Sequence, residues 1–94
     1  MPTEKSLQLW FKKECKKRDI LSYKFSSPAQ RGVPDLILVF KSGAVVFVEL
    51  KHPDGKGKLS TLQTKAIRDI QRQGATVYVS HTKEHLTQIL DAHA

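Results

Sequence analysis

The fold is decided by residues 34–51, whose sequence is PDLILVFKSGAVVFVELK. Two apolar segments, 35–40 and 44–51, flank the short stretch Lys41-Ser42-Gly43. Segments rich in Val, Ile and Phe that are joined by a short turn containing Gly are typical of an antiparallel β-hairpin. Apolar residues fill both sets of alternating positions in 35–40, so we expect that strand to be covered on both faces. Pro34 fits its place because proline is tolerated at the first residue of a strand.

Residues before the hairpin predict one helix and one strand. Thr3 is a suitable N-cap, and apolar residues recur at helical spacing from Glu4 to about Arg18. The segment 20–26 alternates loosely and ends at a loop that contains Ser, Pro and Gly. That combination is typical of a strand followed by a turn.

Residues after the hairpin predict two more helices and one more strand. Ser60 and Gln63 have the spacing of a capping box, which opens a helix that ends near Gly74. We expect a strand over 76–80 that runs parallel to its partner, because a helix connects the two. A last helix, with Thr82 as its N-cap and Leu86, Ile89 and Leu90 facing inward, is expected over 83–92.

Together these elements predict one domain, residues 1–94, with the order α-β-β-β-α-β-α. The expected class is α/β, with a central mixed sheet flanked by helices. An apolar run such as Ala44–Val48 is far shorter than the roughly 20 residues that a membrane span needs. We find no secretory signal and a single cysteine, Cys15, which cannot form an internal disulfide. We therefore expect a cytoplasmic protein, located in the host cytoplasm if a phage encodes it.

The charge of the chain is positive and uneven. Lys and Arg number 16 against 9 Asp and Glu, which gives +7, and residues 1–31 hold eight basic and three acidic side chains, which is +5 of that total. In the first helix Lys12, Lys13, Lys16 and Lys17 form a basic stripe, which is either a solvated helix face or a surface that follows nucleic-acid phosphates. Basic residues elsewhere in the chain favour the second interpretation; they are Lys24, Arg31, Lys56, Lys58, Arg68 and Arg72.

Two acids and a base fall at one end of the hairpin. Glu49 and Lys51 share one face of their strand, and Asp35 begins the strand that pairs with it. Two carboxylates about 4 Å apart repel by around 4 kcal/mol at an effective dielectric near 20, so burying both requires a cation, either Lys51 or a divalent metal. Mg²⁺ prefers oxygen ligands of this kind. The alternative is a buried Glu49–Lys51 ion pair with Asp35 only capping a turn.

Two further polar residues stand at the start of core-facing helical stripes. Gln63 precedes Ala66 and Ile67 on one stripe, and Glu4 precedes Leu7 on another, so we expect both to point toward the sheet. The alternatives are a capping role for Gln63 and a favourable helix-dipole interaction for Glu4. Other chemistries have less support, because Cys15 has no partner histidine at a known spacing. The four histidines form no metal-binding motif.

The motifs together resemble the VRR-NUC branch of the PD-(D/E)XK nuclease superfamily. They are Gly32-Val33-Pro34-Asp35, then after thirteen residues Glu49-Leu50-Lys51, then Gly57-Lys58-Leu59-Ser60 and Gln63. The resemblance spans nearly the whole chain, as in the minimal stand-alone members from phages and bacteria. One departure is Thr61, which stands where relatives commonly have proline.

The resemblance implies a restriction-endonuclease-like α-β-β-β-α-β core with a short C-terminal helix. It also implies a divalent-metal-dependent DNA endonuclease that uses Mg²⁺, with Mn²⁺ as a substitute. Asp35, Glu49 and the Leu50 backbone carbonyl would hold the metal, and Lys51 would orient or activate water. Glu4 would sit at the edge of the site, and Gln63 would steady the water network or the phosphate. The stand-alone members resemble dimeric Holliday-junction resolvases, which suggests a homodimer that acts on branched DNA.

Two other functions fit the same residues. One is a nucleic-acid-binding module without hydrolysis, in which the basic surface binds phosphates and the acids are structural. The other is a small interaction protein whose first helix pairs with an acidic partner.

Overall fold

In the computed structural model, which describes residues 2–94, helices and strands follow one another in the predicted order. The helices are α1 (Glu4–Lys17), α2 (Thr61–Arg72) and α3 (Lys83–Ala92), and the strands are β1 (Leu21–Lys24), β2 (Leu36–Val39), β3 (Val45–Leu50) and β4 (Thr76–Ser80). None of these described helices combines the length and the apolar character that crossing a bilayer requires.

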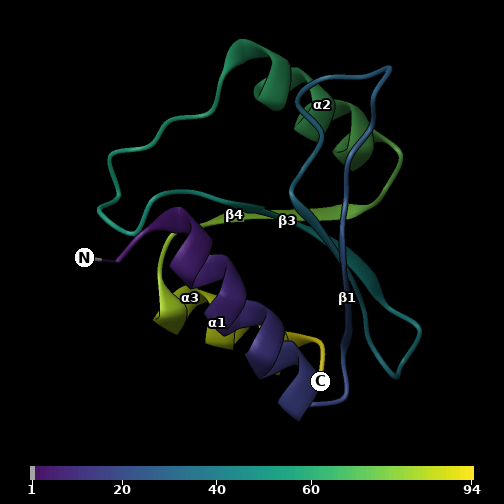
Figure 1. Ribbon diagram of the computed structural model, residues 1–94. Coiled ribbons are helices and arrows are strands. Elements are labelled where there is room, and N and C mark those ends of the chain that lie inside the picture. The colour runs from purple at the N-terminus through teal and green to yellow at the C-terminus, as the bar shows by residue number, and fades with distance from the viewer. Residues whose placement is uncertain (1) are drawn as a thin grey trace.

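The four strands form one mixed sheet in the order β1-β2-β3-β4. β1 pairs with β2 and β2 with β3 in antiparallel orientation, whereas β3 and β4 are parallel. Helix α2 lies on one side of the sheet, and α1 and α3 lie together on the other (Figure 1). The predicted α/β class, the hairpin and the parallel last strand are therefore confirmed.

Each helix begins where its capping residue predicts. The side chains of Thr3, Ser60 and Thr82 accept hydrogen bonds from backbone N–H groups in the first turn of their helices. In α2 the capping box is complete, because the Gln63 side chain accepts a hydrogen bond from the backbone N–H of Ser60 at 2.9 Å. Such caps satisfy orphan N–H groups and stabilise a helix by about 1 kcal/mol each.

The core fills the space between the sheet and the α1–α3 pair. Side chains from alternate positions of β2 and β3 contribute to it, together with the inward stripes of both helices. Cys15 lies within this core, and its burial raises the pKa of the thiol to about 11. It is therefore a buried structural residue, as its isolation in the sequence predicts. The inward residues of α3 are those predicted: Leu86, Ile89 and Leu90.

The face of the sheet toward α2 is covered less completely than predicted. Ile37 and Val39 of β2 are only half-buried, and Leu21, Tyr23 and Val45 are exposed. The expectation that residues 35–40 are covered on both faces is therefore only partly correct, because one face is buried and the other is half-buried. The reason is that the 12-residue α2 packs on β4, at one side of the sheet, and leaves the hairpin side open.

Candidate active site

The register of the hairpin brings the two predicted acids together. Leu36 pairs with Val48, so the next step along the two strands places Asp35 opposite Glu49. Asp35 Oδ2 also accepts a hydrogen bond of 2.9 Å from the backbone N–H of Leu50. Asp35 is thus fixed across the hairpin, and it does not act as the turn cap that the alternative interpretation assigned to it.

Glu49 is buried, with an exposed fraction of 2%. Its Oε2 atom accepts a hydrogen bond of 2.9 Å from Gln63 Nε2 and lies 3.4 Å from Lys51 Nζ. The Glu49–Lys51 ion pair is therefore present. It leaves Glu49 Oε1 unsatisfied, and within residues 2–94 this is the one buried side-chain polar atom that has no hydrogen-bond partner. A buried acceptor in that condition costs about 1–3 kcal/mol.

Gln63 connects the start of α2 to the end of β3. Its Oε1 atom accepts hydrogen bonds of 2.9 Å from the Ser60 backbone N–H and from Lys51 Nζ, while its Nε2 donates to Glu49. One side chain therefore makes both the capping contact and the contacts to Glu49 and Lys51, which the sequence presented as alternatives. The prediction that Gln63 points toward the sheet is confirmed.

The electrostatics of the site favour a proton or a cation on Glu49. The pKa of Glu49 is raised to about 7, first by burial and then by the negative charge of Asp35, while Lys51 opposes the rise. An acid with this pKa is only partly ionised near neutral pH. Lys51 therefore balances the two carboxylates incompletely.

Two loops close around the site through glycines. Gly32 has a φ of +85°, and a Cβ atom there would lie 2.5 Å from the backbone C and O of Leu62. The loop that leads into Asp35 thus touches the first turn of α2, and only glycine fits at the contact. Gly57 lies against the Lys51 side chain, where a Cβ would be 3.4 Å from Lys51 Cδ.

The side chains present fit a hard divalent cation. Oxygen ligands that are few in number and leave room for water suit Mg²⁺, and Asp35 and Glu49 supply two carboxylates, one with the unpartnered Oε1 atom. Within residues 2–94 no group of three or more His, Cys, Asp or Glu side chains is arranged to hold a metal. These side chains alone therefore do not surround a metal ion. The Leu50 backbone carbonyl remains a prediction for the third protein ligand.

Glu4 does not have the orientation that the sequence predicts. It lies in the first turn of α1, on the opposite side of the sheet from α2, and it is exposed instead of pointing toward the sheet as predicted. The stripe that it begins does reach the core, through Leu7. Helical periodicity identifies the stripe, but it does not show that the first turn extends past the covered surface.

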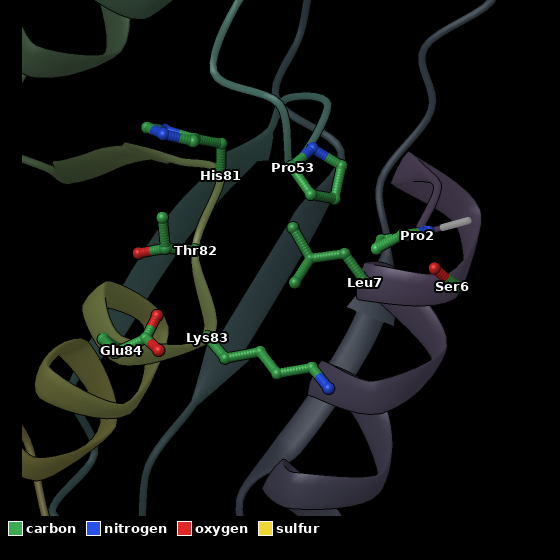
Figure 2. A pocket seen from close by; sticks show the side chains of 8 residues that line it. All are labelled: Pro2, Ser6, Leu7, Pro53, His81, Thr82, Lys83 and Glu84. Carbon is green, nitrogen blue, oxygen red and sulfur yellow. The ribbon is translucent and has the colours of Figure 1, made fainter.

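A cavity of about 310 Å³ lies between the first turn of α1 and the segment 81–84. In Figure 2 Leu7 points from α1 toward Pro53, and Lys83 extends from the start of α3 toward α1. The Lys83 amine lies 5.3 Å from the centre of the Trp10 ring. The lining includes none of Asp35, Glu49, Lys51 and Gln63, so this cavity is separate from the candidate active site.

The predicted nucleic-acid-binding residues fall into two places. Arg31, Lys56 and Lys58 are exposed in the loops on either side of the site, next to Gly32 and Gly57. Lys12, Lys13 and Lys16 line a hollow between α1 and β1, whereas Lys17 forms an ion pair of 3.6 Å with Glu14. Lys24, which the sequence also favoured as a phosphate contact, lines an adjoining hollow together with Lys5, which was not predicted. The available signal for Lys5 was its place at the start of the helix that carries the basic stripe.

Comparison with known proteins agrees with this arrangement. The family model described as VRR-NUC domain matches residues 3–84. A solved structure titled VRR-NUC domain superposes with a TM-score of 0.87 at 23% sequence identity, and the match covers 100% of both chains. The protein named Putative nuclease p44, from Acyrthosiphon pisum secondary endosymbiont phage 1, is 40% identical over 53 residues, which is 56% of this chain and 57% of the phage protein.

The fold and the acid–acid–base site thus define a small α/β nuclease-type domain. The chain belongs to the VRR-NUC domain family. The family resemblance of the sequence motifs is confirmed by the family model and by the fold of the solved relative.

Proposed function

We propose that this protein is a divalent-metal-dependent DNA endonuclease that hydrolyses phosphodiester bonds. The observation that carries the proposal is the unpartnered, buried Oε1 atom of Glu49, which lies across the hairpin from Asp35 and beside Lys51. Membership in the VRR-NUC family and the printed name of the phage relative support a nuclease.

The residues of the site suit phosphodiester hydrolysis. Asp35 and Glu49, with the Leu50 carbonyl, would hold Mg²⁺ or Mn²⁺, which when bound polarises a phosphoryl oxygen and lowers the pKa of its water. Lys51 would place a positive charge beside the attacked phosphate and offset the negative charge that develops there. Gln63 fixes the Lys51 ammonium through a 2.9 Å hydrogen bond, so this charge is oriented before substrate binds. We keep Glu4 as a proposed residue at the edge of the site.

We further propose that the protein acts on branched DNA as a homodimer. The motif resemblance to stand-alone VRR-NUC proteins, which are similar to Holliday-junction resolvases, supports this part. Two sites in one dimer would cut opposed strands of a junction. A measurement of molar mass by light scattering tests the oligomer, and a monomer at micromolar concentration with and without junction DNA would contradict it.

The activity is tested by cleavage of a four-way junction and of a linear duplex, each with Mg²⁺ and with EDTA. We expect cleavage of the junction with Mg²⁺ and none with EDTA. One preorganised charge contributes about 10²- to 10³-fold in rate, so Lys51→Ala should lose at least that factor, and Asp35→Ala should abolish cleavage. Lys65→Ala is the matched control, because Lys65 is exposed and pairs only with Asp69 on α2.

Two results would contradict the mechanism. One is cleavage that persists in EDTA, and the other is full activity of a folded Asp35→Ala protein. If the protein binds DNA with strong salt dependence but forms no product under any metal, the non-catalytic binding module replaces the nuclease.

A further inference from the structure

A groove runs between α1 and β1, on the free edge of the sheet. Two adjoining hollows of about 430 and 290 Å³ form it, and they share Leu9 and Lys12. Its basic side chains are Lys5, Lys12, Lys13, Lys16 and Lys24. We call this surface the α1–β1 groove.

The lysines of the α1–β1 groove have no carboxylate partners. None of the five forms an ion pair within residues 2–94. The acidic residue of its lining, Asp19, is paired with Lys41 at 3.1 Å. Six other basic side chains of the described chain do pair with carboxylates, namely Lys17, Arg18, Lys41, Lys51, Lys65 and Arg72. Within residues 2–94 ten Lys and Arg side chains form no ion pair, and five of these ten lie in the groove.

The floor of the α1–β1 groove is apolar. Leu9 and Leu21 are 53% and 54% exposed, respectively, and Ile20 lies between the two elements that carry them. A row of ammonium groups above an apolar floor matches a sugar–phosphate backbone, whose phosphates are charged and whose sugar rings are largely apolar. An acidic peptide would satisfy the charges as well, but the length and position of the groove favour nucleic acid.

The groove begins at the catalytic end of the sheet. Lys24 pairs with Leu36, and the next residue, Phe25, donates its backbone N–H to the carbonyl of Asp35 at 2.7 Å. From there the groove follows α1 on the side of the sheet opposite α2 and Gln63. A nucleic-acid segment in the groove is therefore continuous with the site at one end but lies on a different face.

The length of the groove fits several phosphates. Lys5 and Lys16 are 11 residues apart on one helix, which at 1.5 Å per residue corresponds to about 17 Å. One strand of a duplex carries a phosphate for about every 3.4 Å of axis, so this length spans about five phosphates.

We propose that the α1–β1 groove binds the sugar–phosphate backbone of a nucleic-acid segment outside the bond that is cut. The part of this inference that concerns the cut bond rests on the proposed nuclease function. It identifies a second contact surface in addition to the loop residues Arg31, Lys56 and Lys58, and thereby a substrate with two segments that the protein contacts. The segment is either single-stranded or one strand of a duplex arm.

The test compares two triple variants of equal charge. The groove variant is Lys12→Gln/Lys13→Gln/Lys16→Gln, and the control is Lys65→Gln/Arg68→Gln/Arg72→Gln, which neutralises a basic stripe on α2. Binding is measured in EDTA by fluorescence anisotropy over a range of salt concentrations. The probes are a labelled single strand, a linear duplex and a four-way junction.

We expect the groove variant to bind at least tenfold more weakly near 100 mM salt. Its slope of log K against log salt should be shallower by about 2 to 3, because three phosphate contacts are lost. The control variant should keep most of the wild-type affinity and most of the wild-type salt slope. A larger loss on the single strand identifies an unpaired segment as the occupant, and a larger loss on the duplex identifies a duplex arm.

Equal effects of the two triple variants, or no effect of the groove variant, would overturn the proposal. So would tight binding of polyglutamate to the groove with unchanged DNA binding, which would indicate an acidic protein partner. Cleavage by the wild type with Mg²⁺ is measured separately. If the wild type cleaves DNA but the groove variant binds DNA normally, only this inference is wrong. If the groove binds DNA but the protein never cleaves it, only the proposed nuclease function is wrong.

Discussion

Glu49 is the residue whose charge state most affects this protein. Its pKa of about 7, against an ordinary value of 4.5, means that the folded chain binds a proton there more tightly than the unfolded chain. For an acid with a raised pKa, the stabilising contribution is fully present below pH 4.5 and is lost as the pH rises through 7. Without metal, the site therefore opposes folding at neutral pH.

We predict that Glu49→Gln is more stable than the wild type at pH 7.5 in EDTA and that the difference shrinks toward pH 4.5. Each pKa unit corresponds to about 1.4 kcal/mol, so the change across this range is on the order of 3 kcal/mol. Urea unfolding at several pH values measures it. In the wild type Mg²⁺ should raise the melting temperature more at pH 8 than at pH 5.5, because a proton and a cation compete for Glu49. A difference that does not vary with pH would contradict the assignment.

Gly32 is the residue where backbone conformation and close approach act together. Gly32→Ala places a Cβ 2.5 Å from Leu62 in addition to the strain of a positive φ, whereas Gly43 has a φ of +89° with nothing within 4 Å. We predict that Gly43→Ala costs about 1 kcal/mol and Gly32→Ala about 2–4 kcal/mol. Thermal unfolding measures both, and equal losses would show that the Leu62 contact relaxes freely.

At the residue level the sequence predicted Asp35, Glu49, Lys51 and Gln63 because their spacing matches a known motif. It did not predict that Leu50 donates to Asp35, since that hydrogen bond depends on the register of the hairpin. The contact of Gly32 with Leu62 joins segments 30 residues apart, which no local pattern specifies.

Helix α2 couples an element boundary to the site. Ser60 accepts a hydrogen bond from the Gln63 N–H at 3.1 Å, and Thr82 makes the same contact with His85 at the start of α3. We predict that Ser60→Ala and Thr82→Ala each cost about 1 kcal/mol. Only Ser60→Ala should also slow cleavage, by roughly tenfold, because the first turn of α2 holds Gln63 against Lys51. Melting curves and cleavage rates of the two variants test this prediction. Equal cleavage rates of the two variants would show that the α2 cap does not affect the site.

The helices and strands were largely predictable because their signals are local. The three N-caps and the alternation of β3 each lie within a few residues of the feature that they define. The extent to which the sheet is covered could not be predicted, because the position of α2 over β4 depends on the whole chain. The α1–β1 groove was predicted only in part, because Lys24 joins the helical stripe through tertiary packing.

The reactivity of the single thiol, on Cys15, measures whether the core of the molecule is closed. Cys15 is fully buried, and the pKa of its thiol is about 11, compared with 9.0 for a free thiol. At pH 8 the thiolate, which is the reactive form, is therefore about 100-fold less abundant than in an unfolded chain. We predict that a disulfide reagent labels the native protein at least 100-fold more slowly than the protein in guanidinium, and rapid native labelling would contradict the closed core.

Gln63 serves helix initiation and holds the ammonium with the same oxygen atom, so correct assembly and chemical competence are linked in this domain. When the first turn of α2 frays, Lys51 loses its hydrogen bond to Gln63 and keeps only its ion pair with Glu49. Under the proposed nuclease function, a copy with a frayed α2 should therefore cleave its substrate more slowly. Through this shared atom, loss of the α2 cap also removes the contact that orients the Lys51 ammonium.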